Sequence, residues 1–401
     1  MKESKIVIGA NFGDEGKGLV TNHFCEDALN RGLKPVVIFH NGTAQRGHTV
    51  DYTTKLRHVY HHFGSGTAEG VPTFFAKTFF IHPMTYTKEY YELLEQHLFP
   101  LNLKGYVDPE AKVITPFDMM IDHITENWIA EQNGEREYGS CGFGSWCAIE
   151  DRYGDPTMKT HFTVADFASW TDEEYLFHME EIWRDCLVIL FKRGVQLDKI
   201  TTYREYFDKH SVGRQSLICN FRSDILFFLE KNEIITFDNL YHKFDSFIFE
   251  NGQGLGLDFY YDDVWHTTSR TGVTYPFEIL ADKKDISVDA CYVTRSYVTR
   301  HGIGPIEQEA QKKEINTEMF DKTNVHNDFQ GGLRYGVMKK SDVITRIDND
   351  FEKVKLDTRF SKNVEDVKTF FSNNAPSKKD YIKNGNEILN KYLQNVVKNN
   401  L

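Results

Sequence analysis

A short glycine-rich segment near the start of the chain contains residues that could bind a phosphate and act on it. Residues 13–18 read Gly-Asp-Glu-Gly-Lys-Gly. Backbone N–H groups of such a turn attract an anion, and Lys17 stands where a phosphate-binding lysine would stand. Gly18 replaces the Ser or Thr that normally holds Mg²⁺ in a phosphate-binding loop, and Asn11 replaces its first glycine. Asp14 would repel a phosphate, so we expect it to bind a metal ion or to take a proton. The alternative interpretation is a flexible surface turn.

The elements around this loop indicate an α/β fold. Residues 5–9 and 35–39 are short apolar runs typical of buried strands, and residues 19–31 between them predict a helix that stops at Gly32. This strand–loop–helix–strand order is typical of a parallel sheet. Three further elements are expected: strands at 247–249 and 290–299, and a helix at 172–193 after a capping box of Thr171 and Glu174.

We therefore expect a P-loop-NTPase-like fold, with a central, mostly parallel sheet flanked by helices. No repeat or Ser/Gly linker divides the chain, so residues 1–401 are expected to form a single domain. Helical segments would be inserted at about 155–245. A short helical tail would end the chain, with its helix at 388–397.

Composition excludes some classes of protein. Lys and Arg total 47 against 59 Asp and Glu, a net charge of −12, which argues against a general nucleic-acid-binding protein but not against a small cationic pocket. We read no membrane span and no signal peptide, which favours the cytoplasm, or the host cytoplasm for a viral chain. The six scattered cysteines form no CxxC pair and are expected to be free thiols.

Further motifs follow in the order seen in one enzyme family. They are residues 41–49, 139–144, 251–254 with Asp258, 268–269, 297–305 and 345–348. Together with residues 13–18 they resemble the adenylosuccinate synthetases over most of the chain. The resemblance implies a ligase that joins L-aspartate to C6 of inosine monophosphate (IMP), using GTP and Mg²⁺ through a 6-phosphoryl intermediate.

The resemblance also implies catalytic roles. Asp14 would take the proton from purine N1 and, with the backbone of Gly47, would hold Mg²⁺. His48 would stabilise or protonate O6, since an imidazole can donate near neutral pH, and Lys17 would offset charge on the transferring phosphoryl group. Gln253 would read the purine edge. A structural loop histidine and a turn-stabilising amide are the alternative interpretations of His48 and Gln253.

Other residues would hold the nucleotides and the amino acid. By resemblance the nucleotide contacts are Gly13, Glu15, Gly16, Gly18, Gln45, Thr49, Ser140, Cys141, Gly142, Thr268, Arg300 and Asp348. Asp348 would select GTP, because a carboxylate accepts from both N1–H and N2–H₂ of guanine, although ATP stays open. Arg334 would fork onto the carboxylate of the amino acid. A structural role is the alternative for Arg300 and Arg334.

Departures from the family pattern leave the acceptor open between two nucleotides. The differing positions lie around the expected nucleotide, at Gln45, Arg46, Cys141 and Phe143. A divergent phage and archaeal-like branch, which includes 2-aminoadenylosuccinate synthetases of the viral diaminopurine pathway, acts on dGMP with ATP or GTP. That branch often carries a smaller residue at position 14, so Asp14 favours IMP.

The resemblance predicts a homodimer as well. However, the arginine that reaches across the family's dimer is replaced here by Asp155. Two alternatives come from other classes: another phosphotransferase such as a nucleotide kinase, and a non-catalytic purine-nucleotide-binding protein.

Overall fold

Eight strands form one central sheet in the computed structural model, which describes residues 2–52, 56–100, 103–133, 142–258, 270–302, 304–306, 308–315 and 331–366. All neighbouring strands of this sheet run parallel. In spatial order they are β14 (Phe360–Asp366), β11 (Ile286–Thr294), β1 (Lys2–Gly9), β10 (Ser246–Gly254), β2 (Pro35–Phe39), β5 (Thr73–Phe75), β7 (Gly105–Val107) and β9 (Asn232–Ile234). The predicted α/β fold with a parallel central sheet is confirmed.

Three two-stranded ribbons accompany the sheet. They are β3 (His48–Asp51) with β4 (Arg57–Tyr60), β6 (Phe80–Ile81) with β8 (Lys112–Val113), and β12 (Tyr297–Arg300) with β13 (Arg334–Val337). The helices are α1 (Lys17–Asn30), α2 (Pro83–Glu95), α3 (Pro116–Asn133), α4 (Val164–Ser169), α5 (Asp172–Lys192), α6 (Val212–Lys231), α7 (Phe237–Tyr241), α8 (Thr274–Ile279), α9 (Lys312–Ile315) and α10 (Lys340–Phe351). Short 3₁₀ or π turns are η1 (Thr67–Glu69), η2 (Cys147–Arg152), η3 (Arg204–Phe207) and η4 (Leu255–Leu257).

Helices cover both faces of the sheet, which explains the continuous apolar runs in its central strands, such as Ile6-Val7-Ile8 of β1 and Val36-Val37-Ile38-Phe39 of β2. Val7 of β1 belongs to one core cluster, together with side chains of α1, α2, α3, α5 and α6. Its neighbours Ile6 and Ile8 belong to a second cluster, with side chains of α7 and α10. Because successive strand residues point to opposite faces, β1 is buried on both sides and its carboxyl end has a fixed position.

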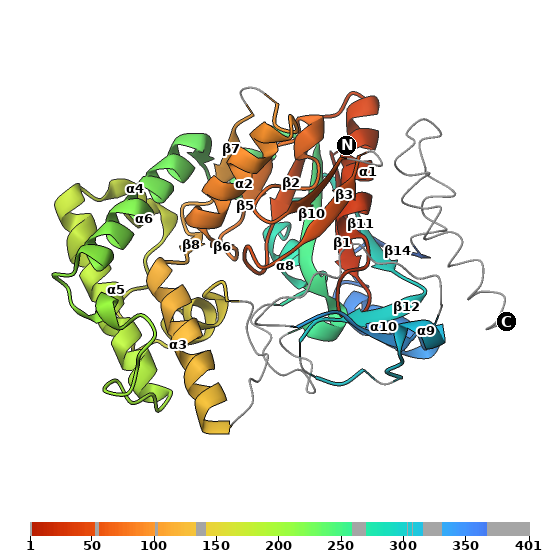
Figure 1. Ribbon diagram of the computed structural model, residues 1–401. Coiled ribbons are helices and arrows are strands. Elements are labelled where there is room, and N and C mark those ends of the chain that lie inside the picture. Colours follow the sequence, from red (N-terminus) through yellow and green to blue (C-terminus); the bar gives the residue numbers. More distant parts are fainter. Residues whose placement is uncertain are drawn as a thin grey trace.

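Helices α3, α4, α5 and α6 gather to one side of the sheet (Figure 1). The predicted capping box at the start of α5 is confirmed, since Thr171 N–H donates to Glu174 Oε2 at 2.8 Å and Glu174 N–H donates to Thr171 Oγ1 at 3.2 Å. A fully buried ion pair stabilises this unit. The guanidinium of Arg152 in η2 donates to the two carboxylate oxygens of Asp118 in α3, at 2.8 and 2.7 Å.

The predicted elements agree with the structure except at one place. The expected strand at 290–299 is wrong as a single element, because the chain leaves the sheet after Thr294 and β12 pairs with β13 in an antiparallel ribbon instead. Thr294 Oγ1 accepts from Asn11 Nδ2 and donates to Arg295 O, so its side chain holds the chain where it turns. The expected C-terminal tail lies outside the described residues.

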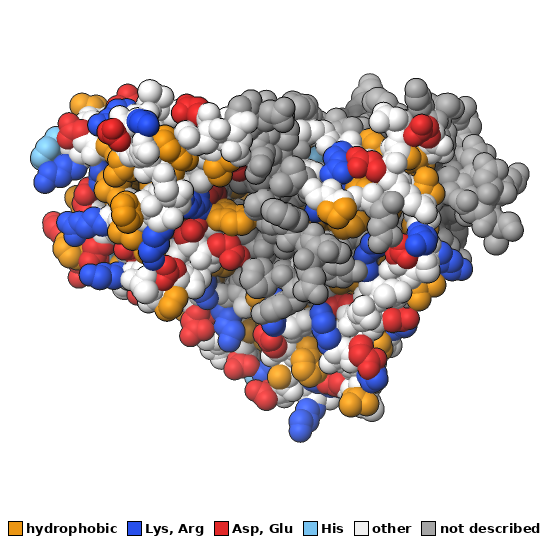
Figure 2. Space-filling view, turned by 90° about the horizontal axis from the view of Figure 1, so that it is seen from below, with side chains coloured by type: hydrophobic (Ala, Val, Ile, Leu, Met, Phe, Trp, Pro, Cys, Tyr) orange, Lys and Arg blue, Asp and Glu red, His pale blue; other side chains and the backbone are white. Residues whose placement is uncertain are grey.

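The described surface carries both signs of charge. Seen from below, Lys and Arg side chains alternate with Asp and Glu over the described part of that face (Figure 2). Within the described ranges no helix is long and apolar enough to cross a bilayer. The five described cysteines form no disulfide with one another.

Candidate functional site

The glycine-rich loop joins the carboxyl end of β1 to the first turn of α1. Gly13, Asp14 and Gly16 have positive φ angles of 106°, 58° and 90°, a conformation that glycine adopts freely and aspartate adopts at some cost. No side chain caps the helix at Gly16. The first N–H groups of α1 are therefore available to an anion.

The buried side chain of Glu15 stabilises the shape of this loop. Its Oε1 accepts a hydrogen bond of 2.6 Å from the backbone N–H of Asn11, and the side chain is buried. Burial raises the pKa of Glu15 to about 7, although Lys17 opposes the shift. A Cβ on Gly9 would lie 2.3 Å from Glu15 Oε2, so Gly9 leaves the space that the carboxyl fills. The structure thus gives Glu15 a role in loop shape, and its expected nucleotide contact stays a prediction.

Lys17 is the first residue of α1 and is almost fully buried. Burial lowers its pKa, while the carboxylates of Glu15, Asp14 and Glu250 oppose this effect. The next residue packs against the strand that carries His48. A Cβ on Gly18 would lie 3.0 Å from the backbone carbon of His48 and from Thr49 O. A Ser or Thr of the usual phosphate-binding loop would collide with β3, which explains Gly18 and brings Lys17 close to His48.

Asp14 faces the turn that follows β12. Its Oδ2 lies 3.7 Å from Nε2 of His301, and both side chains are about a quarter exposed. Thr299 Oγ–H donates to Gly13 O at 2.9 Å, which ties the end of β12 to the loop. Asp14 is the carboxylate of the loop that remains open to a ligand, as a proton acceptor or metal ligand would need to be.

His48 begins β3 and is held by a carboxylate. Its Nδ1 lies 2.7 Å from Oε1 of Glu250, and both side chains are buried. Ser65 Oγ–H also donates to that oxygen at 2.5 Å. The sequence analysis did not single out Glu250 or Ser65. The available signal was a carboxylate directly after the buried run at 247–249.

Arg46 is buried and links β10 to the segment that follows β2. Its guanidinium donates to Glu250 O at 3.1 Å and to Asn41 O at 2.5 Å, and it stacks on the Phe39 ring with its central carbon 3.9 Å from the ring centre. Burial lowers the pKa of Arg46 to about 10, although Glu250 opposes the shift. The arginine that departs from the family pattern at this position is therefore packed and hydrogen-bonded within the protein core.

Two of the expected nucleotide loops are linked to each other. Thr43 Oγ1 lies 2.8 Å from Ser145 Oγ and accepts from Gln45 N–H at 3.2 Å. Beyond Ser145, Gly142 O accepts from His123 Nε2 at 2.9 Å. Phe143 stacks on His61 with ring centres 6.5 Å apart. These contacts hold the loops around Gln45 and Gly142 next to each other, on one side of the candidate site. Ser140, Cys141 and Thr268 lie outside the described residues.

The adjacent histidines 61 and 62 have structural contacts. His61 Nδ1 lies 3.0 Å from Ala44 O, and His62 Nε2 accepts from the backbone N–H of His82 at 2.7 Å. Among the described residues, the one cluster with metal-like spacing is Asp118, Cys147 and Cys186, where Asp118 is already paired with an arginine.

Gln253 and Arg300 both make contacts within their own loops. Gln253 Nε2 donates to Leu257 O at 2.5 Å, the turn-stabilising contact that was the alternative interpretation of this amide. Arg300 is buried, stacks on Phe12 and donates to Pro305 O at 2.9 Å. Burial lowers the pKa of Arg300 to about 10, and the nearby charge of Arg334 adds to this effect.

Arg334 is already committed to a carboxylate of its own chain. Its guanidinium forks onto Glu309 with contacts of 2.8 and 2.5 Å. It also donates to Gly302 O and Gly304 O, at 3.0 and 2.8 Å. In this structure Arg334 holds the turn after β12, and its expected contact with the amino acid remains a prediction.

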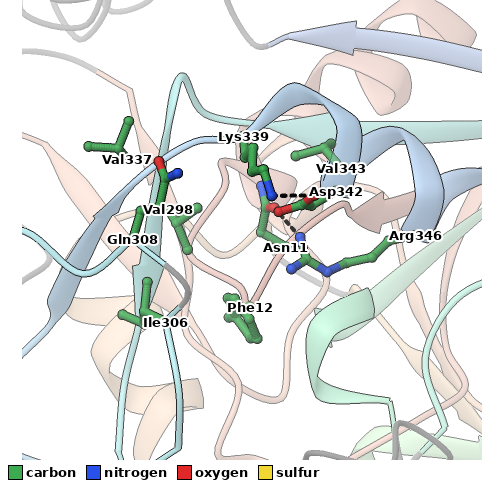
Figure 3. Close-up of a pocket in the computed structure, with 10 residues that line it drawn as sticks. All are labelled: Asn11, Phe12, Val298, Ile306, Gln308, Val337, Lys339, Asp342, Val343 and Arg346. Carbon is green, nitrogen blue, oxygen red and sulfur yellow. Dashed lines mark hydrogen bonds and ion pairs between the residues drawn. The ribbon is translucent and has the colours of Figure 1, made fainter.

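A small recess with a cavity volume of about 10 Å³ lies between the glycine-rich loop, the β12–β13 ribbon and the first turns of α10 (Figure 3). Its lining includes Asn11, Phe12, Val298, Lys339, Asp342 and Arg346. Lys339 Nζ lies 3.6 Å from Asp342 Oδ1, and Arg346 Nη1 donates to Asn11 Oδ1 at 3.0 Å. Five of its ten lining residues are polar or charged, and the space holds about one water molecule, so the recess would have to widen to admit a nucleobase.

The structure does not bring Asp348, expected to read a guanine, to this recess. Asp348 is exposed on α10 and pairs with Lys362 at 2.6 Å. The matched segment 345–348 lies inside the helix. Asp342, in contrast, lies in the first turn of α10 and lines the recess. The expected contact of Asp348 with the donor base stays a prediction.

Comparison with protein families agrees with this arrangement. The model of the adenylosuccinate synthetase family matches residues 6–339. The chain belongs to the adenylosuccinate synthetase family. The expected resemblance is thus confirmed, and the family is one of ligases.

Adenylosuccinate synthetases from several bacteria are related to the chain at low identity. The protein from Synechocystis is 26% identical over 80% of this chain and 66% of its own length. Those of Petrotoga mobilis and Finegoldia magna are each 25% identical, over 90% and 94% of this chain and 82% and 87% of their own. The chain thus spans about two thirds of the first relative and more of the others.

Solved structures share the fold of this adenylosuccinate synthetase family member. The fully ligated adenylosuccinate synthetase of Plasmodium falciparum superposes with a TM-score of 0.61, at 18% identity, over 85% of this chain and 73% of that one. The succinoaminodeoxyadenylate synthetase of cyanophage S-2L, bound to dGMP and dATP, superposes with a TM-score of 0.52, at 13% identity, over 98% and 91%. At these identities the likeness establishes the fold.

Proposed function

We propose that this protein joins L-aspartate to C6 of IMP, driven by hydrolysis of GTP in the presence of Mg²⁺. The observation that carries the proposal is the arrangement of three side chains at the carboxyl edge of the sheet. Asp14 and Lys17 belong to the loop after β1, and His48 is packed against them through Gly18. A base, a phosphate-binding cation and an imidazole are the groups that phosphorylation of a purine oxygen needs.

The proposed reaction has two steps. Asp14 takes the proton from N1 as O6 attacks the γ-phosphoryl group of GTP, and GDP leaves. The amine of aspartate then attacks C6, phosphate leaves with the former O6, and the amine loses a proton. Lys17 offsets negative charge during the first step. His48 contacts the oxygen that is phosphorylated and then released.

The residues at Asp14 fit a magnesium ion. Mg²⁺ prefers oxygen ligands and is commonly held by one or two carboxylates together with substrate phosphates. Asp14 offers one accessible carboxylate, and the backbone of Gly47 is the second expected group. When bound, the ion would neutralise charge on the transferring phosphoryl group.

The recess beside α10, which would have to widen to admit a base, is the proposed site of the donor base. We assign the base-reading role to Asp342, in place of Asp348. A carboxylate accepts two hydrogen bonds from guanine and would meet an acceptor at N1 of adenine, which supports GTP as the donor.

The positions that differ from the family pattern also support IMP as the acceptor. Arg46 points into the core and Phe143 packs on His61, so both substitutions are compensated within the protein. Asp14 keeps the carboxylate that IMP needs at N1. The alternatives, dGMP with ATP or GTP and a nucleotide-binding protein without turnover, remain outcomes of the test. A homodimer in the cytoplasm remains part of the proposal.

The experiment measures phosphate release from purified protein with Mg²⁺ and L-aspartate. IMP, dGMP and GMP are crossed with GTP and ATP, and products are weighed by mass spectrometry. We expect a succinyl-purine product from IMP and GTP that requires aspartate. The same mass shift with dGMP alone would show that dGMP, and not IMP, is the acceptor. Binding without phosphate release for every pair would overturn the ligase.

A further inference from the structure

Glu250 is a buried carboxylate whose two oxygens are both occupied. It lies in the middle of β10, with Oε1 2.7 Å from His48 Nδ1 and 2.5 Å from Ser65 Oγ. Its Oε2 accepts from the backbone N–H of Ser65 at 3.2 Å. The side chain is completely inaccessible to solvent. A carboxylate fixed at both oxygens has one orientation, and so does the ring that donates to it.

The surroundings keep Glu250 ionised despite burial. Burial alone would raise its pKa, but His48, Ser65 and Arg46 outweigh this effect and hold the pKa below its ordinary value. Arg46 also donates to the backbone oxygen of Glu250 at 3.1 Å. The position of the carboxylate is therefore set by groups from three segments: β10, the loop before β3, and the turn before η1.

An ionised Glu250 determines which nitrogen of His48 can reach a ligand. A neutral imidazole has two tautomers, and the partner of one nitrogen selects between them. With Nδ1–H donated to the carboxylate, Nε2 is the ring atom left for another partner, and in the imidazolium form, whose charge Glu250 would balance, it carries a proton that can be donated to an oxygen. His48 Nε2 is buried and makes no hydrogen bond to any residue in the described ranges. Such an atom at a reaction site points to a ligand contact.

We propose that Glu250 is the positioning residue of His48, and that Ser65 in turn fixes Glu250. Glu250 acts through the ring and does not touch the nucleotide. The inference rests on the proposed function, because it assigns Nε2 of His48 to the oxygen that is phosphorylated. It adds to the site two residues, Glu250 and Ser65, that the sequence analysis did not single out.

A double-mutant cycle tests whether Glu250 acts through His48. Glu250→Gln keeps the shape of the side chain and removes its charge. We expect kcat to fall about 100-fold, because a small misplacement of a reacting group has effects of this size, while KM for both nucleotides changes little. In a His48→Asn background, Glu250→Gln should cause no further loss. A second, equal loss in that background would overturn the inference, as would an unchanged kcat.

Two further variants separate positioning from folding. Ser65→Ala removes the hydroxyl donor to Glu250 and should lower kcat about 10-fold, with no further loss in the His48→Asn background. Asp185→Asn is the matched control, since Asp185 is another buried carboxylate that accepts backbone N–H groups of Lys159 and Thr160. Its kcat should equal that of the wild type. If Glu250→Gln lowers thermal stability more than Asp185→Asn without affecting the kcat of folded protein, Glu250 is merely structural.

A proton spectrum gives an answer that does not depend on turnover. A short hydrogen bond between an imidazole N–H and a carboxylate shifts the proton far downfield of the amide region. We expect such a resonance in the wild type and its loss in both Glu250→Gln and His48→Asn. If the wild type catalyses no reaction but shows this pattern, the proposed function fails and the positioning contact stands. A resonance absent from the wild type, or retained in Glu250→Gln, overturns the inference.

Discussion

Gly254 marks the closest approach between β10 and the glycine-rich loop. A Cβ at this position would lie 2.3 Å from Asn11 O and 2.7 Å from Gly13 N. Both are backbone atoms, so the loop itself would have to move. We expect Gly254→Ala to lower the free energy of unfolding by about 1–3 kcal/mol. We also expect it to weaken binding of a fluorescent GTP analogue, because the N–H groups of the loop lose their alignment.

Gly213→Ala is the matched control for this prediction. A Cβ there would lie 3.6 Å from the Tyr206 ring, an ordinary contact, and Gly213 lies in helix α6. Urea unfolding and nucleotide titration of both variants give the comparison. Wild-type nucleotide affinity in Gly254→Ala would show that the loop tolerates the displacement.

Residue types alone predict which side chains could act but not where they point. The motif at 13–18 allowed Asp14, Glu15 and Lys17 to be listed together, yet Asp14 faces outward while Glu15 braces the loop from inside. The guanidinium of Arg334 could bind a carboxylate of a substrate, but in the structure it pairs with Glu309 of its own chain. These orientations depend on contacts with residues far away in the chain, which spacing does not encode.

At the scale of elements, helix α10 decides which carboxylate can reach the donor base. Successive residues of a helix are rotated by about 100°, so Arg346 lies near the direction of Asp342 and Asp348 points well away from both. Arg346 and Asp342 do line the same recess (Figure 3), and Asp348 pairs with Lys362 instead. The sequence match to 345–348 could not detect this, because it does not include where the helix begins.

We predict that Asp342→Ala raises KM for GTP about 10- to 100-fold, the loss of one bidentate base contact of about 1–3 kcal/mol. Asp348→Ala on the same helix should leave KM for GTP unchanged. Steady-state kinetics with GTP varied at saturating IMP and aspartate makes the comparison. The reverse pattern would return the base-reading role to Asp348.

The strand and helix pattern was the most predictable part of the fold. Short apolar runs at 5–9 and 35–39 and the capping box before α5 identify their elements because local physics fixes them. The break of the 290–299 run is different. It depends on the hydrogen bond between the side chains of Asn11 and Thr294. It also depends on the pairing of β12 with β13, where Tyr297 lies opposite Val337, 40 residues later in the chain. Long-range pairing of this kind leaves no local signal.

At the scale of the whole molecule, the helical unit beside the sheet contains a buried carboxyl that should make stability depend on pH. Asp122 of α3 accepts from Cys147 N–H at 3.0 Å and lies 3.4 Å from Arg193. Burial raises the pKa of Asp122 from 3.8 to about 7, although Arg193 opposes the shift. In the same helical unit, Asp155 lies 2.5 Å from Lys192, and its hydrogen bonds with Lys192 and Thr157 lower the pKa of Asp155.

The sign of the effect follows from which state releases its proton first. Below pH 4 Asp122 is protonated in both states, and its contribution to stability is fully present. Between pH 4 and 7 the unfolded chain ionises while the folded protein does not, so the free energy of unfolding falls, by about 4 kcal/mol at most. Asp122→Asn cannot ionise, so relative to the wild type it should gain stability as the pH rises from 5 to 8. Urea unfolding at both pH values measures the gain. Asp155→Asn should show the opposite sign between pH 2 and 5, because a carboxyl with a lowered pKa stabilises the fold once it is ionised. A constant difference between Asp122→Asn and wild type across the range would mean that Asp122 is ionised in the fold, with Arg193 outweighing burial.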